Sequence, residues 1–237
     1  MRFFIEKGEL IIIEAVFFDL YETLITEWEN GKKKADFSPA TMLGIEEDVF
    51  KSEWKKRREQ RMDGFFPNAK SCLVDIFHTL KRPYNIKDIE TVIENRIQAK
   101  IIPFQLIDEE IIETIMQIKR MDIKVGLVSN CAPEEVVAWD DTSLAQLFDS
   151  VIFSYKVNCA KPNKEIYDIA CSNLNVLPKH SIFIGDGGSN ELEGARKAGL
   201  KAFHATWFQP LFISEKISGF PKLNKASDIL PFIKSNT

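Results

Sequence analysis

Polar side chains stand at four points where apolar runs of the sequence end, and together they could carry out chemistry on a phosphate group. They are Asp19, the pair Ser129 and Asn130, Lys161, and the stretch 186–191 with Asp186 and Glu191. An aspartate can attack phosphorus and carry the group covalently. A lysine and a hydroxyl can stabilise charge on the transferring oxygens. Carboxylates such as those of Asp19 and Asp186 supply the oxygen ligands that Mg²⁺ prefers, so the set suits phosphoryl transfer.

The runs before these side chains predict the strands of a parallel sheet. The first run, 15–24, carries Asp19 at the end of a buried strand, and the later strands are expected at 124–129, 150–153, 181–185 and 201–204. Helices expected at 108–121, 133–139, 164–174 and 191–198 alternate with them. This alternation indicates an α/β fold with a Rossmann-like parallel sheet, helices on both faces and right-handed crossovers. Ligands of such sheets bind beyond the carboxyl ends of the strands, so the polar side chains are expected to converge.

The block 25–105 has a different character. It lacks buried-strand runs and carries charged segments of helical period at 45–62, 68–80 and 86–100, with Pro83 and Pro103 predicted to mark helix ends. We therefore predict a helical cap domain at 25–105, inserted into a core formed by 14–24 and 106–237. Residues 1–13 are predicted to be an N-terminal extension, and whether they add a strand is left open.

Composition limits the partners and the location. The chain has 237 residues and a formal net charge of -4, which gives no general footprint for nucleic acid or an anionic membrane. Its four cysteines show no metal-finger spacing, so reduced thiols are expected. The start is too short and too often interrupted by charge for a signal peptide or a membrane span. We expect a cytoplasmic protein that acts on a small, anionic molecule.

These motifs resemble those of the haloacid dehalogenase superfamily, and the likeness spans nearly the whole chain. The first motif is Asp19-Leu20-Tyr21-Glu22-Thr23, the second Ser129-Asn130, the third Lys161, and the fourth runs from Gly185-Asp186 to Glu191. The resemblance implies a Rossmann-like core with the helical cap inserted after the first motif, and a monomer or homodimer. It implies Asp19 as nucleophile, with Lys161 and Ser129 beside it as catalytic groups. It also implies that Asp19, the backbone carbonyl of Tyr21, Asp186 and Glu191 hold Mg²⁺, Glu191 directly or through water.

Tyr21 is the departure from the phosphatases of this superfamily, which usually have a second Asp at that position. That Asp protonates the leaving group, and loss of such an acid typically costs about 100- to 10,000-fold in rate. Asp-x-Tyr resembles instead the haloacid dehalogenases, which displace halide from carbon without a metal. The acidic fourth motif, with Asp186 and Glu191, favours a metal-dependent phosphatase. We expect the phosphatase, with a metal-independent 2-haloacid dehalogenase and a weakly active or non-catalytic binding protein as alternatives.

Three residues of the first two motifs are expected to touch the substrate: Tyr21, Thr23 and Asn130. Thr23 and Asn130, like Ser129, also have a structural interpretation. The Thr23 hydroxyl can order its loop by bonding to backbone, and Ser129 and Asn130 can cap the helix that follows them. The sequence leaves these alternatives open.

Overall fold

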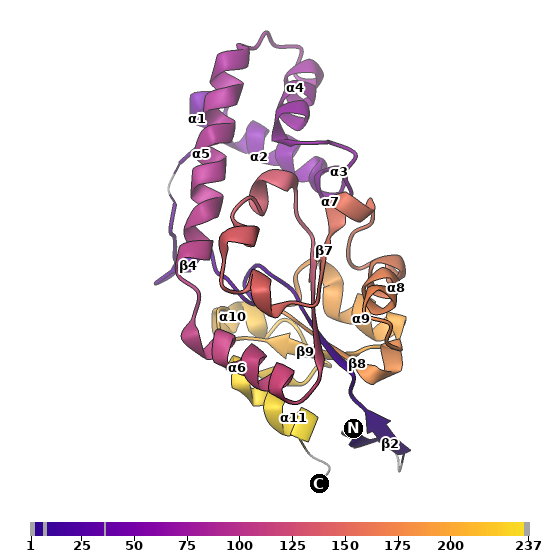
Figure 1. Ribbon diagram of the computed structural model, residues 1–237. Coiled ribbons are helices and arrows are strands. Elements are labelled where there is room, and N and C mark those ends of the chain that lie inside the picture. Colours follow the sequence, from indigo (N-terminus) through magenta and orange to yellow (C-terminus); the bar gives the residue numbers. More distant parts are fainter. Residues whose placement is uncertain (1–2, 7–8, 36, 235–237) are drawn as a thin grey trace.

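The computed structural model describes residues 3–6, 9–35 and 37–234, and its centre is a six-stranded parallel sheet (Figure 1). The strand order is β10-β9-β8-β3-β6-β7. Their bounds are β3 Ala15–Phe18, β6 Lys124–Ser129, β7 Ser150–Phe153, β8 Ser181–Gly185, β9 Lys201–Ala205 and β10 Lys222–Leu223. The sheet and its flanking helices confirm the predicted α/β, Rossmann-like fold class. The five predicted strands are present, and the short edge strand β10 is an addition.

β3 lies in the interior of the sheet, and all four of its side chains are buried. Val16 and Phe18 belong to the apolar core on one face of the sheet, whereas Ala15 and Phe17 belong to the core on the other face. Alternation of side chains along a strand produces this division. Because both faces are covered, β3 reads as a continuous apolar run, and Asp19 is the first charged residue after it.

Helices cover both faces of the sheet (Figure 1). One core contains side chains of α6 (Glu109–Arg120), the 3₁₀ turn η6 (Ala226–Ile229) and α11 (Leu230–Lys234). The other contains side chains of α8 (Lys164–Asn173) and α9 (Glu191–Ala198). Two single-turn helices, α7 (Ser154–Val157) and α10 (Leu211–Ser214), and the turn η4 (Pro178–His180) complete this part.

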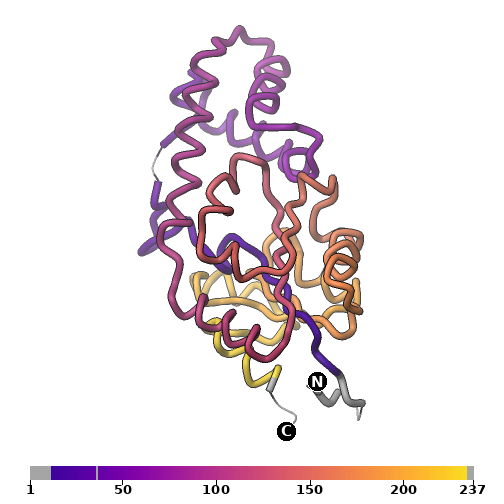
Figure 2. Tube along the Cα trace, viewed as in Figure 1, coloured from indigo at the N-terminus to yellow at the C-terminus, as the bar shows by residue number. Residues whose placement is uncertain are grey.

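Five helices gather at one end of the molecule, opposite the two chain termini (Figures 1 and 2). They are α1 (Pro39–Met42), α2 (Glu47–Lys56), α3 (Arg58–Met62), α4 (Ala69–Thr79) and α5 (Ile86–Gln105), and they enclose an apolar cluster of their own. The chain leaves the sheet after β3, forms these helices, and returns to the side of the sheet at α6, just before β6, as Figure 2 shows. The division at residues 25 and 105 into core and cap stays a prediction.

Several elements differ from those the sequence predicts. Pro103 lies inside α5, because the last turn of that helix continues to place Phe104 in the core. The helix expected at 133–139 is instead a pair of 3₁₀ turns, η1 (Pro133–Glu135) and η2 (Trp139–Asp141), since Glu134 and Glu135 turn to pair with Arg96 of α5. A third turn, η3 (Ala145–Leu147), follows.

Two small hairpins stand apart from the main sheet. β4 (Trp28–Glu29) pairs with β5 (Lys32–Lys33) just after the first motif. In the N-terminal extension, β1 (Phe3–Glu6) pairs with β2 (Glu9–Ile12), and residues 1–2 and 7–8 of that extension lie outside the described residues. Residues 36 and 235–237, which belong to the predicted cap and core, lie outside them as well. None of the helices in the part of the chain described here is long and apolar enough to cross a membrane.

Candidate active site

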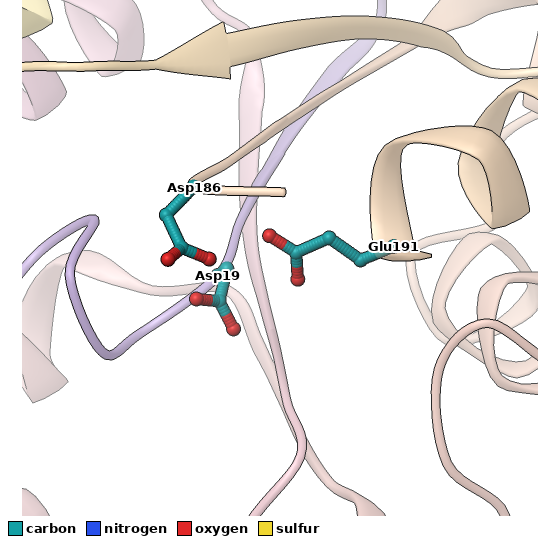
Figure 3. A group of neighbouring side chains, drawn as sticks. All are labelled: Asp19, Asp186 and Glu191. Atoms are coloured by element: carbon teal, nitrogen blue, oxygen red, sulfur yellow. The ribbon is translucent and has the colours of Figure 1, made fainter. Parts of the chain in front are cut away.

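Three carboxylates meet at the carboxyl ends of β3 and β8 (Figure 3). Asp19 follows β3, and its backbone N–H donates to the carbonyl of Ile184 at 2.9 Å, which ties the end of β3 to β8. Asp186 follows β8, and Glu191 extends from the first turn of α9 toward the other two. One oxygen from each carboxylate lies within 4.8 Å of the others. The structure thus brings together three of the residues predicted to hold a metal, and the group could hold a divalent cation.

The ammonium of Lys161 is buried between two of these carboxylates. Its Nζ donates to Asp19 Oδ1 and, at 2.5 Å, to Glu191 Oε2, and the Lys161 side chain is only 1% exposed. Charge-assisted hydrogen bonds of this kind are the strong ones. The lysine therefore fixes the distance between the first and fourth motifs.

Asn130 holds the backbone of Lys161. Its Oδ1 accepts from the Lys161 N–H and its Nδ2 donates to the Lys161 carbonyl, both at 2.8 Å. Asn130 follows β6, which pairs with β3, so this amide bridges the second and third motifs beside the nucleophile's strand. The predicted contact of Asn130 with substrate stays a prediction, and the donor and acceptor capacity left on the amide permits it.

Glu191 is constrained from several directions. Its Oε1 accepts from the Gly187 N–H at 3.0 Å, and its backbone carbonyl accepts from the Tyr167 hydroxyl at 2.7 Å. A Cβ on Gly185 would lie 2.1 Å from Glu191 Oε1, so this position needs a glycine for the carboxylate to approach the strand end. Tyr167 is fully buried, with its ring against Phe183. The buried tyrosine therefore helps to fix the backbone of Glu191 at the start of α9.

The charges of the cluster do not balance. Burial raises the pKa of Asp19, Lys161 partly lowers it, and Asp186 raises it further. Burial and Asp19 hold the pKa of Glu191 well above its ordinary value. Burial lowers the pKa of Lys161, but Asp19 and Glu191 reverse this and raise it overall. One ammonium faces three carboxylates, so the hard, anionic oxygen set fits a divalent cation such as Mg²⁺.

Ser129 and Thr23 are buried beside this cluster. Ser129 is the last residue of β6 and is 1% exposed. The Thr23 hydroxyl donates to Asp19 Oδ2 at 3.5 Å, a long contact, and its backbone carbonyl accepts from Trp207 Nε1 at 2.9 Å. These positions are consistent with either of the roles that the sequence leaves open.

Tyr21 points away from the carboxylates, into the interface with α5. Its hydroxyl donates to the backbone carbonyl of Glu135 at 2.6 Å, and its ring packs edge-on against Phe104. Lys100 Nζ lies 4.5 Å from the ring centroid. Burial, followed by the charge of Glu135, raises the pKa of Tyr21 far above its ordinary value. The phenol is therefore held neutral and is a poor proton donor for a leaving group.

The arginines near the start of the helical block have three different environments. Arg57 pairs with Glu53 and Asp75 inside the block. Arg61 stacks on Trp54, with its guanidinium carbon 3.9 Å from the ring centroid. Arg58 is exposed and donates to Ser189 Oγ at 3.0 Å, so it reaches the loop that carries Asp186.

Sequence reasoning missed Gln209 and Trp207, which follow the strand β9. Gln209 donates to Asp186, and Trp207 donates to Thr23. The signal was available, because Gln209 is a polar residue shortly after a predicted buried strand, as the motif residues are.

The comparisons with known proteins agree with this fold. A family model described as haloacid dehalogenase-like hydrolase matches residues 13–199. That match covers most of the chain and includes all four motifs. The chain belongs to the haloacid dehalogenase-like hydrolase family.

Curated relatives are similar at low identity. The glyceraldehyde 3-phosphate phosphatase of Methanopyrus kandleri is 29% identical over 94 residues, which are 38% of this chain and 40% of the relative. The pyrophosphatase PpaX of Bacillus cereus is 27% identical over 138 residues, which are 54% of this chain and 59% of the relative. The chain thus spans about half the length of these relatives.

Solved structures share the fold. An L-2-haloacid dehalogenase, RSc1362, is similar with a TM-score of 0.61 at 17% identity, over 94% of this chain and 100% of that one. A phosphatase of the family from Thermococcus onnurineus is similar with a TM-score of 0.61 at 19% identity, over 94% and 98%. Since a dehalogenase and a phosphatase fit equally well, the fold does not choose between the two activities.

Asp19→Asn is expected to stabilise the metal-free protein at neutral pH. The raised pKa lets folded Asp19 keep a proton that the unfolded chain has already lost, so the free energy of unfolding falls as the pH rises between the two pKa values. The variant lacks this titration and leaves Lys161 paired with Glu191. We expect a gain on the order of 1 kcal/mol at neutral pH, shrinking at acidic pH, in urea unfolding with EDTA.

The control for this measurement is Asp141→Asn, because Asp141 is an exposed aspartate of the turn η2 and belongs to none of the four motifs. Its unfolding free energy should match that of the native protein at both pH values. A metal-free Asp19→Asn protein that is less stable than the native one at neutral pH would contradict the assignment of surplus negative charge to this cluster.

Proposed function

We propose that the protein is a magnesium-dependent phosphatase that uses Asp19 as nucleophile on a small phosphorylated metabolite. The observation that carries this proposal is the group of three carboxylates, Asp19, Asp186 and Glu191, two of which pair with the buried Lys161. Displacement of halide from carbon requires no such set of metal ligands. Phosphoryl transfer to a carboxylate does, because the nucleophile and the substrate are both anionic.

The reaction has two displacements at phosphorus. In the first, a carboxylate oxygen of Asp19 bonds to phosphorus as the bond from phosphorus to the leaving oxygen breaks, and the leaving oxygen takes up a proton from water. In the second, a water oxygen bonds to phosphorus as the bond to Asp19 breaks. The water's proton passes to solvent, and the products are an alcohol, inorganic phosphate and the restored Asp19 carboxylate.

The residues around Asp19 have separate tasks. Asp19, Asp186, the carbonyl of Tyr21 and Glu191 would hold Mg²⁺, which supplies charge neutralisation between nucleophile and phosphate when it is bound. Lys161 orients Asp19 and stabilises charge on the phosphoryl oxygens, and the Ser129 hydroxyl is proposed to bind one of those oxygens. Both carboxylate oxygens of Glu191 already accept hydrogen bonds from protein groups, so Glu191 supports Lys161 as much as the metal.

Tyr21 limits the proposed activity, because it cannot protonate the leaving group. Its hydroxyl is bonded to the Glu135 carbonyl, and its pKa is far too high for it to give up a proton. Glu22 does not replace it, because its carboxylate accepts from the Thr26 hydroxyl at 2.5 Å and from the Glu27 N–H at 3.0 Å. The leaving group must therefore depart with little help, which favours substrates whose leaving oxygen is stable as an anion.

The substrate is proposed to be small and anionic. The curated relatives act, by their names, on glyceraldehyde 3-phosphate and on pyrophosphate. Pyrophosphate has a good leaving group and would suit a site without a general acid. Tyr21 also favours a second candidate, a 2-haloacid dehalogenase, since the Asp-x-Tyr motif is the one feature of the site that resembles those enzymes.

The first test is hydrolysis of para-nitrophenyl phosphate and of 2-chloropropionate, each with Mg²⁺ and with EDTA. We expect phosphate release that requires Mg²⁺ and falls by on the order of 10³-fold in Asp19→Asn, because the nucleophile is lost. Asp141→Asn should keep the native rate. Chloride release that EDTA leaves unchanged would establish the dehalogenase instead, and no turnover of either compound with intact Mg²⁺ binding would favour a binding role.

The second test addresses position 21. Tyr21→Asp is expected to raise kcat for an alkyl phosphate such as glycerol phosphate by about 100-fold or more, because it introduces a general acid, while para-nitrophenyl phosphate gains much less. Tyr21→Asn is the matched control, since the asparagine side chain has the shape of aspartate but no acidic proton to give to the leaving group. Equal rates for the Asp and Asn variants on the alkyl phosphate would show that protonation of the leaving group does not limit this enzyme.

A further inference from the structure

Gln209 binds the candidate metal ligand Asp186 at two points. Its Nε2 lies 2.7 Å from the backbone carbonyl oxygen of Asp186 and 3.1 Å from the carboxylate oxygen Oδ2. The other carboxylate oxygen, Oδ1, accepts from the Gly188 N–H at 2.8 Å. Each oxygen of Asp186 therefore has one protein donor, and each keeps a lone pair for another ligand.

His204 fixes the orientation of the Gln209 amide. Both atoms of Asp186 that Gln209 contacts are acceptors, so the amide must turn its NH₂ toward them and its Oε1 toward His204 Nε2, at 2.9 Å. His204 must then carry its proton on Nε2 and donate it to the amide oxygen. Its buried Nδ1 has no hydrogen-bond partner among the residues that the structure describes, so an imidazole with its proton on Nε2 fits both sides of the ring.

The same short segment also reaches the nucleophile's loop. Trp207 Nε1 donates to the backbone carbonyl of Thr23 at 2.9 Å, and the Thr23 hydroxyl contacts Asp19 Oδ2. Two residues apart, Trp207 and Gln209 thus hold the first and fourth motifs from one side. Lys161 holds Asp19 and Glu191, and among the described residues the contacts of Asp186 come from Gly188 and Gln209 instead.

The hydrogen bonds from Gln209 to Asp186 matter because Asp186 and Asp19 repel one another. The charge of Asp186 contributes to the raised pKa of Asp19. The terminal torsion of an aspartate is soft, so a carboxylate with no donor on one oxygen can rotate away from a like charge. Groups that orient a metal ligand in this way commonly govern metal affinity, and their loss costs about 10- to 100-fold.

We propose that Gln209 is a positioning residue that holds the Asp186 carboxylate in the orientation in which it binds a divalent cation, with His204 locking the amide of Gln209. The proposal rests on the proposed function, because it takes Asp186 to be a metal ligand. It assigns roles to two residues outside the four motifs. Neither role requires contact with the substrate.

The test is the Mg²⁺ affinity of the protein without substrate, measured by calorimetry. Gln209→Met keeps the length of the side chain and removes its donors, and we expect it to weaken Mg²⁺ binding by about 10- to 100-fold. Gln117→Met is the matched control, because Gln117 bonds only to Glu113 on the exposed face of α6. His204→Gln, which can still donate to the Gln209 oxygen, should retain most of the native affinity.

The possible results separate this proposal from the one on which it rests. A native protein that binds Mg²⁺, with Gln209→Met binding it equally well, would overturn the positioning role and leave the metal site standing. A native protein that binds no Mg²⁺ would overturn the proposed function itself. Metal-free melting curves of the variants serve as the structural readout: lost stability in Gln209→Met with unchanged Mg²⁺ affinity would mean a packing role only. Native Mg²⁺ affinity in His204→Phe, which cannot donate to the Gln209 oxygen, would overturn the role of His204.

Discussion

The geometry of the site depends on one buried cation, the ammonium of Lys161. It bonds to Asp19 after β3 and to Glu191 at the start of α9, so it sets the spacing between two carboxylates that would otherwise repel each other. Removing Lys161 would leave Asp19 and Glu191 without their shared cation, and breaking a buried ion pair in this way typically costs about 3–5 kcal/mol. Lys161 itself is held by the side-chain amide of Asn130, which ties this constraint to β6 at the centre of the sheet.

The remaining negative charge explains why the site suits a divalent cation and how the protein prepares for it. Lys161 neutralises part of the charge, and the pKa values of Asp19 and Glu191 are still raised. Asp186 is held in place by Gly188 and Gln209. The hydroxyl of Tyr21 has a structural role, since it bonds to the backbone carbonyl of Glu135 while the ring packs against α5. The proposed phosphatase thereby combines a set of candidate metal ligands with weak protonation of the leaving group.

Much of this could be predicted from sequence, because buried parallel strands are apolar runs and a polar residue at their ends stands out. Asp19 and Asp186 follow that rule, whereas helix α7 separates Lys161 from β7, and the alternation of strands and helices indicated the fold class. The prediction at 133–139 failed because long-range ion pairs with Arg96 replaced local helical bonds. The prediction that Pro103 ends a helix was wrong, because burial of Phe104 outweighed the tendency of proline to end a helix. Gln209 was missed although it follows a predicted buried strand, because its partner, Asp186, is seen only in the structure.

The most direct test of the central claim is to look for the phosphoryl group on Asp19. The protein would be quenched in acid during turnover of para-nitrophenyl phosphate with Mg²⁺, digested, and analysed by mass spectrometry. The account predicts that the peptide with Asp19 gains the mass of one phosphoryl group, that hydroxylamine removes it, and that EDTA prevents its formation. Phosphate release at an undiminished rate in Asp19→Asn, with no modified peptide in the native protein, would contradict the account.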